Sequence, residues 1–178
     1  FADHVRRYAA ANLVRDQGEE GACTGFGLAA VVQYLFWVRG RLSAGTLLSA
    51  RMLYHLARFY DEWPGEKYDG SSCRGALKGW HKHGVCAETL YPYHGGAPGA
   101  GLTDARTADA LRRPLGSYFR VNHKDLVAMH SAIAEVGILY ATCTVHEGWS
   151  KVGPDGVIEL LPKLLGGHAF AIVAYDDQ

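Results

Sequence analysis

The sequence predicts an α+β fold in which helical segments come first along the chain and strand-like segments come second. An almost wholly apolar run from Phe26 to Val38 has the character of a buried helix. A second apolar pattern, at helical spacing, follows Ser49, whereas apolar and polar residues alternate after Gly137 and again from His168. This order is typical of a helical part that packs against a sheet.

Length and composition limit the class of protein. The 178 residues are 48% hydrophobic and 20% charged, which suits one soluble globular domain or two lobes that share one core. The 18 basic and 18 acidic residues balance, so charge indicates neither a nucleic-acid nor a membrane-surface partner. No apolar run reaches the roughly 20 residues that cross a bilayer, and the opening segment FADHVRRY lacks a signal-peptide core. We expect a protein that is not exported, or a chain that begins after processing.

The first predicted helix follows a short polar loop that starts at Gln17 and carries two glycines. Cys23 falls at the junction of loop and helix, and the helix is expected to end near Gly40, a residue suited to a left-handed turn. Unpaired N–H groups and the positive end of the helix dipole stabilise an anion at a helix start. The position therefore favours the thiolate form of Cys23.

Two more helices are predicted in the first half of the chain. Ser49 has the residue type of an N-cap, and apolar residues recur at helical spacing in the segment ARMLYHLARFYDEW that follows it. His55 lies in this segment and is interpreted as a packing or surface histidine. The third helix is predicted from about Cys73 to His83, with its end at Gly84.

A glycine-rich segment, His94 to Thr103, separates the two halves and predicts a lobe crossing or a mobile surface loop. It lacks the preceding strand and the following Lys-Ser/Thr pair of a phosphate-binding loop. The second half predicts one helix, over residues 124–137, on which His130 is interpreted as structural. Strands are predicted at residues 117–122, 138–146, 157–161 and 168–175.

Cys23 and His168 together suggest nucleophilic catalysis. A thiolate at a helix start is a nucleophile, and an imidazole on a strand is a candidate base for it. Gln17 is close enough in the chain to aim its side-chain amide at the point that the Cys23 backbone N–H faces, and two such donors form an oxyanion hole for acyl transfer. The other interpretation of Cys23 is a small apolar residue packed under a helix start, because free cysteines are commonly buried.

These residues resemble the signatures of the papain-like cysteine peptidases, in a bacterial-type form without the usual disulfide cysteines. The nucleophile motif Gln-Gly-x-x-Gly-x-Cys corresponds to residues 17–23 and is followed by Phe26, as in the family. The segment from Gly167 to Tyr175 is similar to the strand that carries the family's histidine. Gly84-Val85 and Leu90-Tyr91-Pro92-Tyr93 are similar to the family's helix exit and Tyr-Pro-Tyr segment, in the same order. The resemblance covers nearly the whole chain.

The resemblance implies a single papain-like domain, residues 1–178, with a helical lobe at about 17–110 and an antiparallel sheet lobe at about 111–178. The active-site cleft would lie between the lobes, with a polypeptide as the substrate. Asp69, Gly70 and Ser71 fall where the family has its Asn-Gly-Gly substrate strand, of which Gly70 is kept, and Gly167 would line the same site. The alternative for this segment is a capping loop with Ser71 or Ser72 as the N-cap.

The resemblance also implies the mechanism, in which Cys23 attacks a peptide carbonyl, His168 handles the proton and Gln17 binds the oxyanion. The Asn that orients the histidine in the family would fall beyond Gln178, so we expect a fragment or one product of cleavage. Thr24 replaces the usual Trp, which alters the leaving-group side of the cleft. A propeptide or the segment after Gln178 is a further candidate partner.

Two other functions are compatible with the same residues. A papain-like fold kept for binding or regulation, without catalysis, is one alternative, and acyl transfer to an amine instead of water is another. The intact set of Gln17, Cys23 and His168 favours an enzyme, because binding alone does not require it.

The remaining cysteines, Cys73, Cys86 and Cys143, are interpreted as structural thiols. Glu20 stands where the family commonly has a cysteine, and although a bond between Cys73 and Cys86 is compatible with the sequence, nothing requires an oxidising compartment. Neither Cys-x-x-Cys nor His-x-x-x-His spacing occurs, so neither a metal nor another cofactor is expected.

Overall fold

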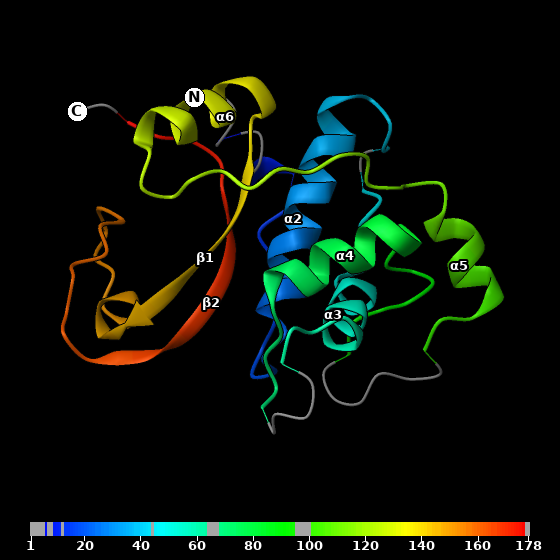
Figure 1. The fold of residues 1–178 in the computed structure, drawn as a ribbon, viewed down its shortest axis with the longest axis horizontal. Helices are drawn as coiled ribbons and strands as arrows, with labels where there is room; N and C mark the ends of the chain where they lie inside the picture. The colour runs from blue at the N-terminus through cyan, green and yellow to red at the C-terminus, as the bar shows by residue number, and fades with distance from the viewer. Residues whose placement is uncertain are drawn as a thin grey trace.

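The computed structural model describes residues 6, 9–11, 13–43, 45–63, 68–94 and 101–176. Helices precede strands along the chain, as predicted, and the fold is α+β (Figure 1). The elements are α2 (Cys23–Val38), α3 (Ala50–Phe59), α4 (Cys73–His83), α5 (Asp104–Ala110), α6 (Leu126–Val136), β1 (Leu139–His146), the short 3-10 helix η1 (Glu147–Ser150) and β2 (Leu164–Ile172). None of the helices within this described part is long and apolar enough to cross a bilayer.

Helix α2 is the central element of the fold, with α3 and α4 on one side and the sheet on the other (Figure 1). It packs against α3 on one side and against β2 on the other, which confirms the predicted buried helix. Two glycines allow the close approach: a Cβ atom at Gly25 would lie 2.5 Å from the Ala50 carbonyl oxygen, and one at Gly27 would lie 3.0 Å from the Ala169 carbonyl oxygen. Residues two apart point to nearly opposite sides of a helix, so each glycine serves a different neighbour.

Local signals determine where α3 and α4 begin and end. The Ser49 side chain accepts a hydrogen bond from the Met52 N–H at 2.9 Å, as predicted for an N-cap. Ser72 caps α4 in the same way, through the Gly75 N–H at 3.0 Å. Helix α4 ends at Gly84, whose φ of +73° is in the left-handed region and whose Cβ position is blocked by the Ala110 carbonyl.

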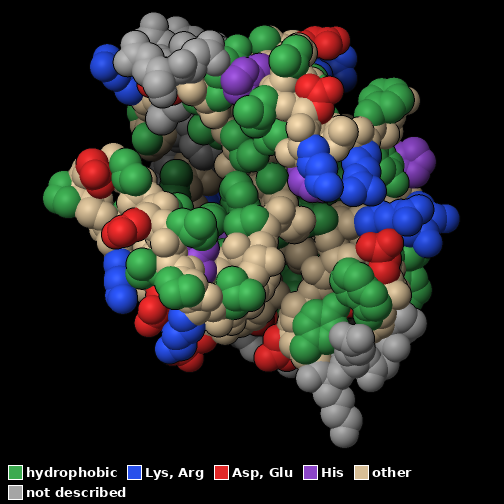
Figure 2. Space-filling model, turned by 60° about the vertical axis from the view of Figure 1, so that its left-hand side comes forward, with side chains coloured by type: hydrophobic (Ala, Val, Ile, Leu, Met, Phe, Trp, Pro, Cys, Tyr) green, Lys and Arg blue, Asp and Glu red, His purple; other side chains and the backbone are tan. Residues whose placement is uncertain are grey.

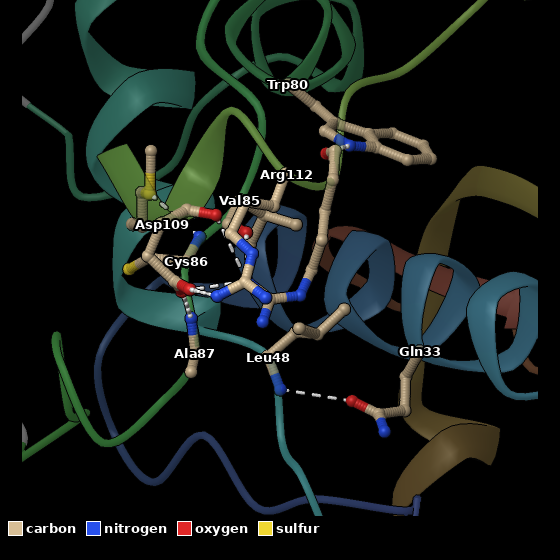
Figure 3. A network of polar contacts seen from close by, with 10 residues as sticks. Gln33, Leu48, Trp80, Val85, Cys86, Ala87, Asp109 and Arg112 are labelled. Atoms are coloured by element: carbon tan, nitrogen blue, oxygen red, sulfur yellow. Dashed lines mark hydrogen bonds and ion pairs between the residues drawn. The ribbon is translucent and has the colours of Figure 1, made fainter. Parts of the chain in front are cut away.

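Helix α5 was not expected from the sequence, because its seven residues carry no apolar repeat. Tertiary contacts stabilise it instead: the Asp109 carboxylate accepts a hydrogen bond from the Ala87 N–H at 2.8 Å (Figure 3). The same carboxylate pairs with Arg113 at 2.7 Å. In the same view the Gln33 side chain accepts a bond from the Leu48 N–H at 3.0 Å and so ties the loop before α3 to α2. Most of the glycine-rich segment, residues 95–100, lies outside the described residues.

Strands β1 and β2 form an antiparallel pair, with Leu139 opposite Ile172 and Cys143 opposite His168. The predicted strand at 138–146 is confirmed, and the predicted final strand is present but begins and ends earlier, at Leu164 and Ile172. The strands predicted at 117–122 and 157–161 are wrong. Their β-branched and aromatic residues suit a strand, but a strand also needs a neighbour for its main-chain groups, and neither segment has one in the described sheet. The division into lobes near residue 110 stays a prediction.

Candidate active site

The loop before α2 holds Gln17 at two points. The Gln17 side-chain amide donates a hydrogen bond to the Glu20 carbonyl at 3.0 Å, and the Gln17 carbonyl accepts one from the Tyr93 hydroxyl at 2.7 Å. An amide nitrogen carries two hydrogens, so one bond leaves the second for a ligand. Gln17 lines a surface hollow of about 580 Å³ together with other residues of its loop and with Tyr93 and His94.

Cys23 is the first residue of α2, at the predicted junction, and is partly exposed. Ala22 precedes it as the N-cap and provides no side-chain hydrogen bond, so the first-turn N–H groups keep their attraction for an anion. Burial disfavours the thiolate form of the other three cysteines. Burial raises the pKa of Cys73 and that of Cys86 each to about 11, and it also raises the pKa of Cys143.

The predicted substrate segment lies beside residues 17–22, the loop before the predicted nucleophile, which we call the nucleophile loop. A Cβ atom at Gly21 would lie 3.0 Å from the Asp69 carbonyl oxygen, and the Thr24 and Ser71 hydroxyls share a hydrogen bond at 2.6 Å. Helix α3 binds two carbonyl groups of the segment: the Tyr54 hydroxyl donates to the Asp69 carbonyl, and Arg58 donates to the Gly70 carbonyl at 2.9 Å. These bonds fix the backbone of the segment against α3 before any ligand arrives.

Ser71 and Ser72 take different parts in this segment. Ser72, and not Ser71, is the N-cap of α4, so the interpretation of this segment as a capping loop is confirmed with Ser72 as the cap. The Ser71 side chain instead faces the start of α2 through Thr24. The segment therefore caps a helix and borders the nucleophile loop at the same time.

His168 lies on β2 opposite Cys143 and is half-buried. The Trp149 ring meets its imidazole edge to face, with 5.9 Å between ring centroids, and the Phe170 ring lies 6.3 Å away. Burial lowers the pKa of His168 below its ordinary value. Gly167, its predicted neighbour in the site, pairs with Thr144, and a Cβ atom there would meet nothing within 4 Å.

Contacts between α2 and the sheet connect the two predicted catalytic segments. Gly27, one turn beyond Cys23, touches the backbone of Ala169, which follows His168. The Tyr140 hydroxyl, from β1, donates a hydrogen bond to the Thr24 carbonyl at 2.7 Å. Tyr140 also lies near Cys73, and burial, with a contribution from the nearby Cys23, raises the pKa of each group. The start of α2 and the two strands are therefore in direct contact.

Three contributors were missed in the sequence. Arg51 reaches the loop before α2, and Tyr140 reaches the first turn of α2, each from an element far away in the chain. Trp149 lies in the short helix after β1 and contacts His168. The one local signal for Trp149 was its residue type, a tryptophan in a segment predicted to connect two strands. That signal did not indicate that the ring would contact His168. His55 and His130 are in contact with Tyr91 and Tyr175, which agrees with their structural interpretation.

The residues that the structure describes contain no group of His, Cys, Asp and Glu side chains placed to hold a metal ion. All four cysteines are free thiols.

Several solved structures share this fold. Xylellain, a cysteine protease from Xylella fastidiosa, is 27% identical with a TM-score of 0.76, over 92% of this chain and 66% of its own. A cysteine protease of Carica candamarcensis in complex with E-64 is 22% identical with a TM-score of 0.58, over 94% of this chain and 74% of its own. Digestive procathepsin L 3 of Tenebrio molitor is 22% identical with a TM-score of 0.60, over 77% of this chain and 42% of its own.

This chain spans slightly less than two thirds of the length of xylellain. The comparison with curated proteins found no match. The family model described as papain family cysteine protease matches residues 2–178. The chain therefore belongs to the papain family of cysteine proteases.

Proposed function

We propose that the protein is an endopeptidase in which Cys23 is the nucleophile, His168 the acid and base, and Gln17 a donor of the oxyanion hole. The observation that carries the proposal is the Gln17–Cys23 segment itself, a loop that leads directly into an uncapped helix start and in which Gln17 is anchored once through its side-chain amide and once through its backbone carbonyl. A thiolate and an oxyanion both gain from donors that are already oriented. The raised pKa values of the other three cysteines support Cys23 as the nucleophile.

The reaction proceeds in two halves. The Cys23 thiolate attacks the peptide carbonyl carbon, and the carbonyl oxygen becomes an oxyanion held by the Gln17 amide and the Cys23 N–H. The C–N bond then breaks as the His168 imidazolium gives its proton to the leaving amine. Water, deprotonated by the neutral His168, attacks the acyl-enzyme, the C–S bond breaks, and the thiolate and imidazolium return.

The substrate in this proposal is an extended polypeptide that lies along Asp69, Gly70 and Ser71 and passes Gly167. The bonds from Tyr54 and Arg58 support this role, because they fix the backbone of the segment before a substrate binds. The open space at Gly167 supports it as well. A propeptide is a further proposed partner, since two of the similar structures are a procathepsin L and a procathepsin B.

The decisive test is labelling by an epoxide inhibitor that alkylates active-site thiols, read by peptide mass spectrometry. We expect label on Cys23, no label there in Cys23→Ala, and a steep loss of labelling rate in His168→Ala. Peptide hydrolysis should fall on the order of 100-fold to 1000-fold in Gln17→Ala, the cost of one oxyanion donor. Cys143→Ala is the matched control and should keep both signals.

Equal labelling of all four cysteines would contradict the peptidase and support a papain fold that only binds. Specific labelling of Cys23 with product appearing on an added amine, and none on water, would instead show an acyl transferase.

A further inference from the structure

A bidentate ion pair joins the loop before Cys23 to helix α3. The two terminal nitrogens of Arg51 donate to the two carboxylate oxygens of Glu20, at 2.7 and 2.6 Å. The Arg51 side chain is 3% exposed, and its hydrogen bond to the Glu20 carboxylate raises the pKa of the guanidinium. A fork of this kind defines the direction as well as the distance between two groups.

The same guanidinium lies over the ring of Tyr93, 4.3 Å from its centroid. The Tyr93 ring also meets Phe26 of α2 edge to face at 4.6 Å, so two elements hold it in one orientation. Its hydroxyl donates to the Gln17 carbonyl at 2.7 Å. Burial, with a contribution from Glu20, raises the pKa of Tyr93 to about 12, so the hydroxyl keeps its proton at any ordinary pH.

Arg51 therefore reaches Gln17 by two routes. One passes through Glu20, whose side chain binds Arg51 and whose carbonyl accepts the Gln17 amide at 3.0 Å. The other passes through Tyr93, which stacks on Arg51 and binds the Gln17 carbonyl. The positions of both the side-chain amide and the backbone carbonyl of Gln17 therefore depend on one buried group of α3, the Arg51 guanidinium. We call these four residues, Gln17, Glu20, Arg51 and Tyr93, the Arg51 network.

We propose that Arg51 is a positioning residue for the Gln17 amide and acts on the reaction only through Glu20 and Tyr93. The inference rests on the proposed role of Gln17. A buried ion pair contributes little net stability, because desolvation of both charges offsets their attraction. What it does provide is a fixed direction for the Glu20 peptide group, and that group determines where the Gln17 amide points.

The test is a double-mutant cycle between Arg51→Met and Gln17→Ala, with kcat/KM for a peptide substrate as the readout. Arg51→Met alone should lower kcat/KM on the order of 10- to 100-fold, the effect of a donor displaced by about 1 Å. In the Gln17→Ala background the same change should have almost no further effect, because the donor that it positions is already gone. Arg51→Lys, which cannot form the fork, should fall between wild type and Arg51→Met.

A second readout separates positioning from damage to the fold. Alkylation of Cys23 by iodoacetamide needs the thiolate but forms no oxyanion, so its rate in Arg51→Met should stay close to wild type. Arg74→Met is the matched control, since Arg74 makes an exposed pair with Glu62 at 3.3 Å, and it should leave both rates unchanged. Tyr93→Phe removes one hydroxyl and keeps the ring, so it tests the second route even where Arg51→Met does not fold.

Each outcome decides between distinct ideas. Equal losses from Arg51→Met in both backgrounds, or equal losses of hydrolysis and alkylation, would overturn the positioning role and leave a structural one. A full loss in Gln17→Ala together with full activity in both Arg51→Met and Tyr93→Phe would overturn it as well. A Gln17→Ala variant with wild-type kcat/KM would instead refute the oxyanion role of Gln17 in the proposed function.

Discussion

The nucleophile loop and the histidine strand are held in place by different means. Directional side-chain bonds fix the loop, which is tied to α3 by Glu20 and to Tyr93 by the Gln17 carbonyl. The β1–β2 ladder and the contact with α2 fix the strand, while His168 itself touches aromatic rings. The sheet side also carries exposed hydrophobic side chains, such as Leu160 and Leu164, and Figure 2 shows such side chains spread over this face.

This difference predicts which substitutions the loop and the strand should each tolerate. A loop held by a few polar bonds loses its geometry when one partner is removed, because a bond of that kind has no substitute nearby. A strand held by its backbone register tolerates side-chain changes but not a displacement of the whole ladder. Experiments on α2, which touches both sides, separate the two cases.

The largest effect is expected from the two glycines of α2. Alanine gains about 1 kcal/mol over glycine in a helix, yet in Gly25→Ala the new Cβ would lie 2.5 Å from the Ala50 carbonyl oxygen. We expect a net loss of about 1–3 kcal/mol in the free energy of unfolding, from overpacking against α3. Gly27→Ala, with its Cβ 3.0 Å from the Ala169 carbonyl oxygen, should cost less stability but reduce peptide hydrolysis, because it displaces the strand that carries His168.

Urea unfolding and kcat/KM on both variants measure these effects. A Gly27→Ala variant that is less stable than Gly25→Ala would contradict the view that the helical side is the tighter of the two contacts.

A smaller effect is expected from Tyr140→Phe. This change removes the hydrogen bond from β1 to the Thr24 carbonyl, 2.7 Å long, and leaves the ring in place. We expect a loss of about 1 kcal/mol in the free energy of unfolding, typical of one buried hydrogen bond. Tyr118→Phe, at a ring that is 43% exposed, is the control and should change nothing measurable. Unchanged stability in Tyr140→Phe would show that the sheet does not depend on this link.

The smallest effect concerns the titration of His168, followed by NMR. Burial lowers its pKa below the ordinary 6.5, so in Cys23→Ala we expect a value under 6.5. In the wild-type protein a facing thiolate should raise that pKa, because the opposite charge stabilises the imidazolium. Identical values in the two proteins would argue against a Cys23–His168 ion pair.

The sign of the pH effect on stability follows from the same shift. With a lowered pKa in the folded state, the unfolded chain binds more protons between that pKa and 6.5. The free energy of unfolding of Cys23→Ala should therefore fall as the pH drops through this window. A Cys23→Ala/His168→Asn double variant should show less of that fall.

Much of the fold follows from local signals in the sequence. The Ser49 side chain caps the start of α3, and the backbone conformation of Gly84 ends α4, each as predicted. Helix α5 and the false strand at 157–161 show the opposite case, since tertiary contacts create the first and the lack of a ladder partner prevents the second. Short segments of this kind are decided by neighbours that no local pattern names.

The candidate site divides in the same way. The position of Cys23 at a helix start was predictable because a polar loop that meets an apolar helix has a recognisable composition. Arg51 was not, because its partner Glu20 lies 31 residues away and an arginine within an amphipathic helix ordinarily faces solvent. Glu20 itself was noted for not being a cysteine, and its carboxylate proves to be the anchor of the loop.

The Glu20–Arg51 ion pair joins the loop before Cys23 to α3 without a disulfide bond. All four cysteines are free thiols, so strong reductants such as dithiothreitol have no bridge to open within this structure. Purification and assay in reducing buffer should then keep the Cys23 sulfur in its lowest oxidation state without loosening the loop in front of it. A disulfide at this place would need oxidising conditions, which also oxidise Cys23. The ion pair holds the loop under the reducing conditions that keep Cys23 a thiol.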